Sequence, residues 1–256
     1  MDKLPAYISN WLAEYCSKAR QEGYVIGISG GVDSALTSTL CAKTGLKTIL
    51  VSMPIHQQPD QLMRAHQHIA WLTSNFSNVT SIEVDLTASF ETFRSTLPDE
   101  VSNHELSMAN SRARLRMTTL YAIGQANACL VAGTGNKIED FGVGFYTKYG
   151  DGGVDVSPIA DLTKSEVWAL AKHLGVSDEI TNAKPTDGLW GSDRTDEDQL
   201  GASYLELEWA MEFNGNEANL SERQREVLAI YRRFNAANQH KMQAIPVCII
   251  PDELRY

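Results

Sequence analysis

The stretch YVIGISGGVDS, residues 24–34, decides the fold, because an apolar run leads directly into a glycine-rich turn. The apolar half is typical of a buried strand, and the residues beyond the turn have the pattern of a helix over residues 33–43. Gly30 and Gly31 carry no Cβ, so backbone N–H groups can face an anion there, and the helix N-terminus adds about half a positive charge. The stretch therefore predicts a strand–turn–helix unit that binds phosphate.

Further apolar runs alternate with helical patterns along the chain. We expect strands over residues 24–29, 47–53, 79–86 and 129–134, and helices over residues 33–43, 59–72, 108–127, 163–175, 197–212 and 222–239. Such alternation is typical of parallel pairing, so the predicted class is α/β, a doubly wound open parallel sheet with helices on both faces. No linker divides the sequence, and we expect a single domain over residues 1–256.

The N-terminal segment indicates an amphipathic helix with Ile8, Leu12 and Tyr15 on one stripe. It lacks the apolar centre of a signal peptide, and no apolar run approaches the roughly 18 residues that a membrane span needs. We therefore expect a soluble, cytoplasmic protein that does not use a membrane as a partner.

Composition and charge narrow the function classes further. Hydrophobic residues make up 43% and charged residues 21%, which excludes a disordered chain. The 22 Lys and Arg against 32 Asp and Glu give a net charge of −10, which disfavours nucleic acid as a partner because phosphate binding needs clustered cations. The cysteines lie far apart, without zinc spacing, and indicate reduced thiols.

The glycine-rich turn has its own chemistry. Ser29 and Ser34 add hydroxyl donors, whereas Asp33 repels anions unless a divalent cation lies between them. The Walker pattern is absent, since no Lys follows the glycines. The alternative reading is a glycine turn with a Ser or Asp helix cap and no ligand.

Basic residues on the helix over residues 108–127 are a second signal. Arg112 and Arg116 share a face one turn apart, and the simplest interpretation is a solvated basic face. Arg114 lies at the edge of an apolar stripe, so we expect its guanidinium to be partly buried against a ligand.

Residues 135–160 and 183–196 are irregular stretches, and long irregular segments are usually functional or mobile. The loop from Gly133 is the third signal, because it combines dense glycine with the acids Glu139, Asp140, Asp151 and Asp155 and the cations Lys137 and Lys148. Just beyond it, Lys164 stands in the first turn of a helix capped by Thr163 and Glu166, where the helix dipole disfavours a cation. That position is explained if Lys164 meets a phosphate.

The segment SGGVDS resembles the pyrophosphate-binding loop of the N-type ATP pyrophosphatases. The motifs GISGGVDS, RARLRM, GTGNK, TKYGDGGVD, LTK, KPTDGLW, TDEDQLGASY and the late HK occur in the order seen in ammonia-dependent NAD synthetases, over residues 24–241. The resemblance implies an adenine nucleotide alpha hydrolase-like fold. It also implies an amide-forming ligase that makes NAD from deamido-NAD, ATP and ammonia, releasing AMP and pyrophosphate.

The resemblance also implies residue roles. ATP would be bound by Gly27, Ile28, Ser29, Gly30, Gly31, Val32, Asp33, Ser34, Thr134, Lys164 and Thr186. Deamido-NAD would be bound by Arg114, Lys148, Asp155, His240 and Lys241. Asp33 and Glu139 would hold Mg²⁺, Asp33 and Lys164 would serve catalysis, and Asp151 would position or deprotonate ammonia.

One departure from the family pattern bears on the metal. Glu139 and Lys148 are nine positions apart, whereas the family pattern has eight, so Glu139 and Asp140 compete for the second metal role. We expect Glu139, because its distance from Thr134 matches the pattern.

Two other classes of function stay open. One is another adenylating ATP pyrophosphatase, such as a tRNA-modifying enzyme, and the other is a non-catalytic nucleotide-binding module. The resemblance further implies a homodimer. Only 23 residues precede the first strand, too few for an amidase domain, so free ammonia is the expected nitrogen donor.

Overall fold

The structure, a computed structural model, describes residues 3–186 and 195–255. Within these ranges the centre is a sheet of four parallel strands in the order β3-β2-β1-β4. The strands are β1 (Gly23–Gly27), β2 (Lys47–Ser52), β3 (Val79–Glu83) and β4 (Cys129–Val131). The predicted parallel sheet is confirmed, although β3 and β4 end three residues earlier than expected.

The order of the strands shows that the sheet is doubly wound. The chain runs outward from β1 through β2 to β3 and then returns to the other side of β1 as β4, so Val25 pairs with both Ile49 and Val131. This reversal opens a crevice beyond the carboxyl ends of β1 and β4, which is where α/β sheets bind their ligands.

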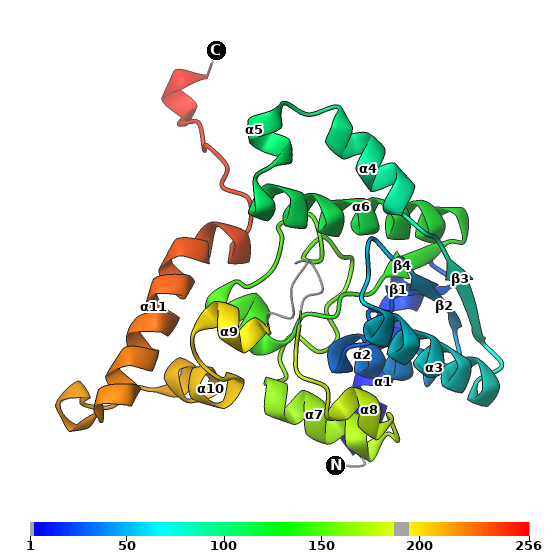
Figure 1. Cartoon of the computed structure of the whole chain (residues 1–256), viewed down its shortest axis with the longest axis horizontal. Helices are drawn as coiled ribbons and strands as arrows, with labels where there is room; N and C mark the ends of the chain where they lie inside the picture. Colours follow the sequence, from blue (N-terminus) through cyan, green and yellow to red (C-terminus); the bar gives the residue numbers. More distant parts are fainter. Residues whose placement is uncertain (1–2, 187–194, 256) are drawn as a thin grey trace.

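Helices cover both faces of the sheet (Figure 1). One face carries α1 (Lys3–Lys18), α2 (Val32–Ala42), α3 (Pro59–Asn75), α7 (Lys164–His173) and α8 (Asp178–Thr181). The other carries α4 (Thr87–Ser95) and α6 (Glu105–Ala126), and the short α5 (Asp99–Ser102) packs against α6. Because successive strand residues point to opposite faces, Tyr24 and Ile26 pack beneath the first group, and Val25 packs with Phe90 and Met108 beneath the second.

A helical lobe with its own apolar core lies beside the sheet (Figure 1). It comprises η1 (Ile138–Val143), α9 (Asp196–Leu200), α10 (Tyr204–Glu212), η2 (Glu217–Asn219) and α11 (Glu222–Met242). The prediction of one helix over residues 197–212 is wrong. Gly201 takes φ 80° and ends α9, and Ser203 then opens α10 with a capping box.

The buried stripe of α1 and the two irregular stretches differ in part from what the sequence predicts. On α1, Ile8 and Leu12 are buried as predicted, but Tyr15 is 39% exposed and Cys16 completes the stripe, because the buried positions repeat every four residues. The irregular stretch over residues 183–196 lies outside the described residues at positions 187–194. The loop over residues 135–160 is irregular apart from η1 and a single bridge between Ala132 and Val156.

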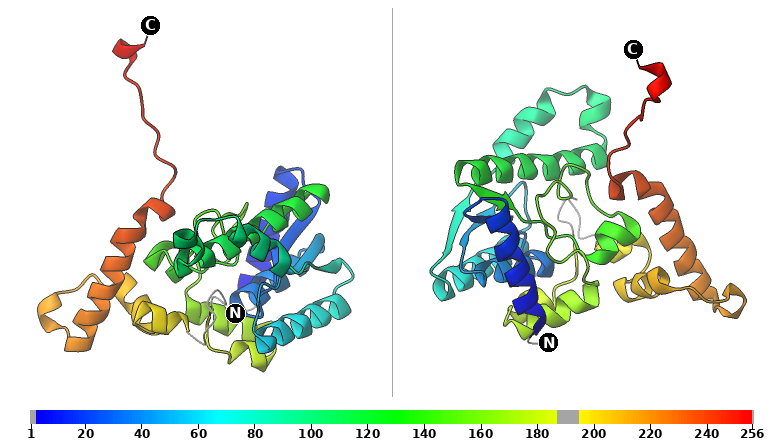
Figure 2. Two further views of the ribbon diagram at one scale, coloured as in Figure 1. Left: turned by 45° about the horizontal axis from the view of Figure 1, so that its top comes forward. Right: turned by 180° about the vertical axis from the view of Figure 1, so that it is seen from behind.

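Beyond α11 the chain leaves the body of the molecule. Residues 243–251 run extended and end in η3 (Asp252–Leu254), and both figures show this tail projecting away from the sheet (Figures 1 and 2). Among the helices of the described ranges, none has the length and apolarity required to cross a membrane.

Candidate active site

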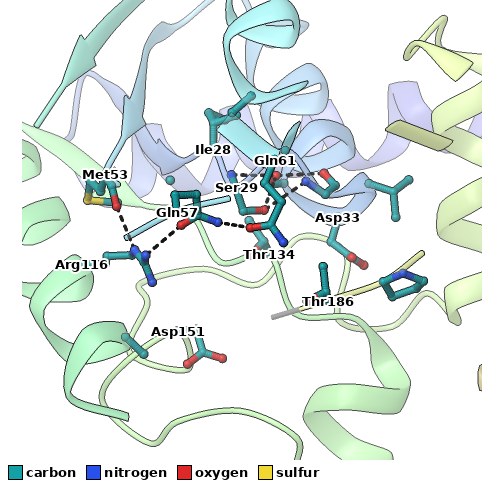
Figure 3. A pocket seen from close by; sticks show the side chains of 18 of the residues that line it. Ile28, Ser29, Asp33, Met53, Gln57, Gln61, Arg116, Thr134, Asp151 and Thr186 are labelled. Atoms are coloured by element: carbon teal, nitrogen blue, oxygen red, sulfur yellow. Dashed lines mark hydrogen bonds between the residues drawn. The ribbon is translucent and has the colours of Figure 1, made fainter. Parts of the chain in front are cut away.

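A cavity of about 270 Å³ occupies the crevice beyond the strand ends. The ends of β1, β2 and β4, the start of α2, one side of α6 and the first residue of α7 all contribute to its lining. Figure 3 shows Asp33 and Thr186 at one end of this cavity and Met53 and Arg116 at the other. Every residue of the predicted ATP set lines it, including Thr134 and Thr186.

The glycine-rich turn is shaped to leave its backbone open to the cavity. Gly30 has φ +84°, and a Cβ there would collide with the carbonyl oxygen of Gln61 on α3. Gly31 is the N-cap of α2 and supplies no side-chain cap, so the positive end of that helix faces the cavity. This geometry suits a phosphate group.

The two serines of the turn have a different role from the one expected. The Ser34 hydroxyl is buried and donates to the carbonyl oxygen of Gly31 at 3.0 Å, while the Ser29 hydroxyl accepts from the Gly31 N–H at 3.2 Å. The hydroxyls also lie 3.1 Å apart. They therefore tie the turn together as well as lining the cavity.

A buried lysine between two carboxylates lies beside the turn. Lys164 is 2% exposed, and its Nζ lies 2.6 Å from Asp33 Oδ2 and 3.1 Å from Glu139 Oε1. Burial alone lowers the pKa of Lys164, but attraction to Asp33 and Glu139 outweighs it and holds the pKa above its ordinary value. The ammonium therefore stays charged at the cavity wall.

Two further side chains orient these carboxylates, and the sequence analysis assigned a role to neither. Asn136 is fully buried and donates from Nδ2 to Asp33 Oδ1 at 3.0 Å, while its Oδ1 accepts from the N–H groups of Ile138 and Glu139. Tyr204 donates from its hydroxyl to Glu139 Oε1 at 2.6 Å. The motifs GTGNK and TDEDQLGASY contain these residues, but their contacts join segments far apart in the chain.

Glu139 and Asp140 point into different cavities. Glu139 lines the large cavity beside Asp33, whereas the carboxylate of Asp140 lies against Gly135 in a neighbouring cavity of about 150 Å³. Burial first, and then the charge of Glu139, raises the pKa of Asp140 to about 8. The geometry therefore favours Glu139 as the partner of Asp33.

The arginines of α6 differ from expectation. Arg114 is exposed and donates from Nε to the carbonyl oxygen of Lys148 at 3.3 Å, so its predicted burial is wrong. The solvated face predicted for Arg112 and Arg116 is also wrong. Both are half-buried: Arg112 lies 4.9 Å from the Phe90 ring centroid, and Arg116 donates to the Met53 carbonyl oxygen at 3.0 Å inside the cavity (Figure 3). The orientation of α6 on β1 and β4 determines which arginine is buried, and helical spacing alone does not specify that orientation.

Most of the residues predicted to bind deamido-NAD gather where the loop after η1 meets the end of α11. Lys148 Nζ donates to the carbonyl oxygen of His240 at 2.7 Å, and Lys241 Nζ donates to the carbonyl oxygens of Gly144 and Tyr146. Asp155 is placed differently: it accepts from the N–H of Val131 at 2.8 Å and from the hydroxyl of Tyr121, at the end of β4.

Asp151 lies between the two cavities and lines both. Its Oδ1 accepts from the N–H of Thr147 at 3.0 Å. Desolvation of its carboxylate raises the pKa of Asp151 to about 6, although the hydrogen bond from Thr147 acts in the opposite direction. The residue as a whole is nevertheless exposed, so a small solute can approach it.

Comparison with known proteins agrees with this geometry. The model of the NAD synthase family matches residues 4–244. The NH3-dependent NAD+ synthetase of Mesoplasma florum is 38% identical over 219 residues, which are 85% of this chain and 87% of that protein. The structure of NMN synthetase from Francisella tularensis has a TM-score of 0.84 at 30% identity and covers 98% of both chains. NH3-dependent NAD synthetase from Campylobacter jejuni, in complex with the nitrate ion, has a TM-score of 0.77 at 26% identity and covers 97% of this chain and 99% of that one.

The doubly wound sheet and its glycine-rich turn define a nucleotide-binding protein with the adenine nucleotide alpha hydrolase-like fold. Within that class the chain belongs to the NAD synthase family, a family of ligases.

Proposed function

We propose that this protein forms the amide of NAD from deamido-NAD, with ATP as the activating substrate and ammonia as the nitrogen donor. The observation that carries this is the buried Lys164 between Asp33 and Glu139, at the phosphate-binding turn of a chain in the NAD synthase family. Its relatives from Mesoplasma florum and Carboxydothermus hydrogenoformans are named as NH3-dependent NAD+ synthetases.

The chemistry divides into two steps. First, an oxygen of the nicotinate carboxylate attacks the α-phosphorus of ATP, and the bond from that phosphorus to pyrophosphate breaks. The amides of the turn and the Lys164 ammonium are already in place to stabilise the negative charge of the phosphates. In the second step the ammonia nitrogen bonds to the acyl carbon and AMP leaves with the electron pair.

A proton must leave the nitrogen during the second step. Asp151 lines the cavity and has a raised pKa, so its carboxylate is suited to hold ammonium and to accept a proton near neutral pH. The residue lines both cavities, and we infer that ammonia reaches the acyl carbon past it.

Mg²⁺ is part of this proposal. Mg²⁺ in phosphate-transfer sites is bound through one or two carboxylates together with phosphate oxygens and water. Asp33 and Glu139 fit that donor set, and in the described part of the chain no cluster of three metal-ligating side chains competes with them. They would hold Mg²⁺, which would neutralise phosphate charge when bound.

The test is a coupled assay that measures NAD, AMP and pyrophosphate from ATP, Mg²⁺, deamido-NAD and ammonium, with glutamine in a parallel reaction. We expect all three products in equal amounts. Pyrophosphate release without NAD would indicate another adenylating enzyme, such as a tRNA-modifying one, and ATP binding without any release would indicate a nucleotide-binding module.

A second candidate differs only in the length of the acceptor. The structural relative from Francisella tularensis is named an NMN synthetase, and its TM-score of 0.84 exceeds the 0.77 of the NAD synthetase from Campylobacter jejuni. Nicotinic acid mononucleotide would present the same carboxylate to the same cavity. Measuring kcat/KM for both acceptors decides between them, and a preference of tenfold or more for the mononucleotide would replace deamido-NAD as the substrate.

Two properties of the whole molecule are also proposed. A homodimer is proposed from the family, and light scattering at micromolar concentration would give twice the chain mass of 28.3 kDa. A cytoplasmic location is proposed because the reaction consumes ATP, and the buried cysteines Cys16, Cys41 and Cys129 are free thiols in agreement with it.

A further inference from the structure

Tyr204 connects the helical lobe to the cavity. It is the first residue of α10, is fully buried, and packs edge-on against Trp168 with ring centroids 6.1 Å apart. Its hydroxyl lies 2.6 Å from Glu139 Oε1 and 3.3 Å from Asp196 Oδ2. A buried hydroxyl beside two carboxylates is costly unless it donates a hydrogen bond, so this position is not explained by packing alone.

The same oxygen of Glu139 is bound from two sides. Glu139 Oε1 accepts from the Tyr204 hydroxyl and also from Lys164 Nζ at 3.1 Å, and that Nζ lies 4.6 Å from the centroid of the Tyr204 ring. One tyrosine therefore contacts both the ammonium and the carboxylate. Within the described residues no hydrogen bond to Glu139 Oε2 occurs, so the second oxygen is left to the cavity that Glu139 lines.

The Tyr204 hydroxyl is the donor in this contact, because a carboxylate oxygen can only accept a hydrogen bond. Hydrogen bonds to a charged acceptor are shorter and about twice as strong as neutral ones, and the 2.6 Å separation is typical of them.

We propose that Tyr204 is a positioning residue: its hydroxyl holds Glu139 Oε1 against Lys164 and thereby presents Oε2 to the Mg²⁺ that accompanies ATP. The proposal rests on the proposed function, because it concerns how this chain receives Mg²⁺ and ATP. Tyr204 is not among the residues that line the cavity, so it acts through Glu139.

The experiment compares the wild type with Y204F, which keeps the ring, its contact with Trp168 and the Lys164 contact but removes the hydroxyl. The matched control is Y231F, because Tyr231 is a partly buried tyrosine of the same lobe core, outside the cavity lining. ATP binding is measured by calorimetry at a series of Mg²⁺ concentrations, together with the Mg²⁺ dependence of NAD formation.

We expect Y204F to need about tenfold more Mg²⁺ for half-maximal ATP binding and turnover, the scale at which residues that orient metal ligands act. The affinity of Y204F for ATP without Mg²⁺ should be unchanged. Y231F should match the wild type in ATP binding and in the Mg²⁺ dependence of turnover. Equal Mg²⁺ dependence in Y204F and the wild type would overturn the proposal, as would a loss of ATP affinity that is the same with and without Mg²⁺.

A second comparison tests whether the Tyr204 hydroxyl acts through Glu139. In the E139Q background the carboxylate is gone, so removing the hydroxyl as well should not shift the remaining Mg²⁺ dependence, and a further shift of fivefold or more would contradict the proposed route. Because ATP binding is measured without turnover, a chain that makes no NAD but shows the Y204F shift would refute the proposed function and leave the role of Tyr204 standing.

Discussion

At the scale of single residues, three charged side chains form one cluster at the cavity wall. Lys164 is almost completely buried, which is tolerated because Asp33 and Glu139 pair with it from two sides. Breaking such a cluster at one member leaves an uncompensated charge. The effect of replacing either acid therefore depends on which of its carboxylate oxygens pairs with Lys164 and which faces the cavity.

Replacing Asp33 with Asn should preserve the fold and lower turnover by ~10²-fold or more, the scale of removing one electrostatic stabiliser. Asp33 lines the cavity, and Glu139 remains to pair with the buried Lys164 after the change, so we expect a lower Tm but an intact fold. Turnover and Tm should be measured together, with D161N as the control because Asp161 is an exposed acid outside the cavity lining. Near-normal rate and Mg²⁺ dependence in D33N would show that the metal assignment is wrong.

The adjacent acids Glu139 and Asp140 should behave differently. E139Q should lower turnover at limiting Mg²⁺ by about 10- to 100-fold, because metal sites lose affinity on that scale when their ligand environment is altered. D140N should stay within about threefold of the wild type, since Asp140 faces the second cavity. Titration of the rate with Mg²⁺ for both variants checks this, and the reverse ranking would transfer the metal role to Asp140.

At the scale of elements, the packing of α3 against α2 contains a buried histidine. His68 on α3 is 3% exposed and its Nε2 lies 3.0 Å from the Ser38 hydroxyl on α2. Burial lowers the pKa of His68 from 6.5 to about 4. The helices therefore pack in their most stable form when this imidazole is neutral.

This shift predicts acid sensitivity of the α2–α3 contact. A depressed pKa in the folded state means that stability is complete above pH 6.5 and is lost as the pH falls toward 4. At about 1.4 kcal/mol per pKa unit, the loss amounts to roughly 3 kcal/mol. Urea unfolding at pH 7, 5 and 4 measures the free energy of unfolding of the wild type and of H68Q. As the pH falls, this free energy should decrease more steeply for the wild type.

The control for this prediction is on the same helix. His66 is exposed, with 48% of its side chain accessible, and pairs with Glu83. H66Q should therefore retain the acid sensitivity of the wild type. Parallel pH profiles for the wild type and H68Q would show that His68 is not the titrating group.

At the scale of the whole molecule, the cavity is assembled from the sheet and the helical lobe, whereas the C-terminal tail contributes nothing to it. Glu139 comes from η1 in the lobe, Asp33 from α2 and Lys164 from α7. The tail over residues 244–255 makes no hydrogen bond or ion pair to the other described residues, and Ile245, Val247 and Ile249 are 66–79% exposed.

Deleting residues 244–256 should therefore change the Tm of the chain by no more than about 2 °C, because almost no burial is lost on removal. Thermal unfolding measures this directly. A deletion that also removes the last turn of α11 serves as the control and should destabilise the chain, since it takes away the Lys241 contacts with Gly144 and Tyr146. A loss of 5 °C or more from the short deletion would mean that the tail is bound, to the body or to a second chain.

The sequence by itself determined the features that depend on neighbouring residues. The strand–turn–helix at residues 24–34, the parallel order of alternating strands and helices and the capped helix at Thr163 are local patterns, since hydrophobic period, glycine and capping act within a few residues. The set of residues predicted to bind ATP followed from resemblance to a family, and the structure gathers it around one cavity.

Tertiary structure alone decided which way the side chains at the site point. Glu139 and Asp140 are adjacent in the chain, yet η1 turns one toward Lys164 and the other toward Gly135. The Tyr204 hydroxyl meets Glu139 across 65 positions of sequence. Burial of Arg116 instead of Arg114 likewise depends on how α6 lies against the sheet. These outcomes depend on the relative placement of whole elements, which is determined by packing between distant segments. Local sequence patterns therefore do not predict them.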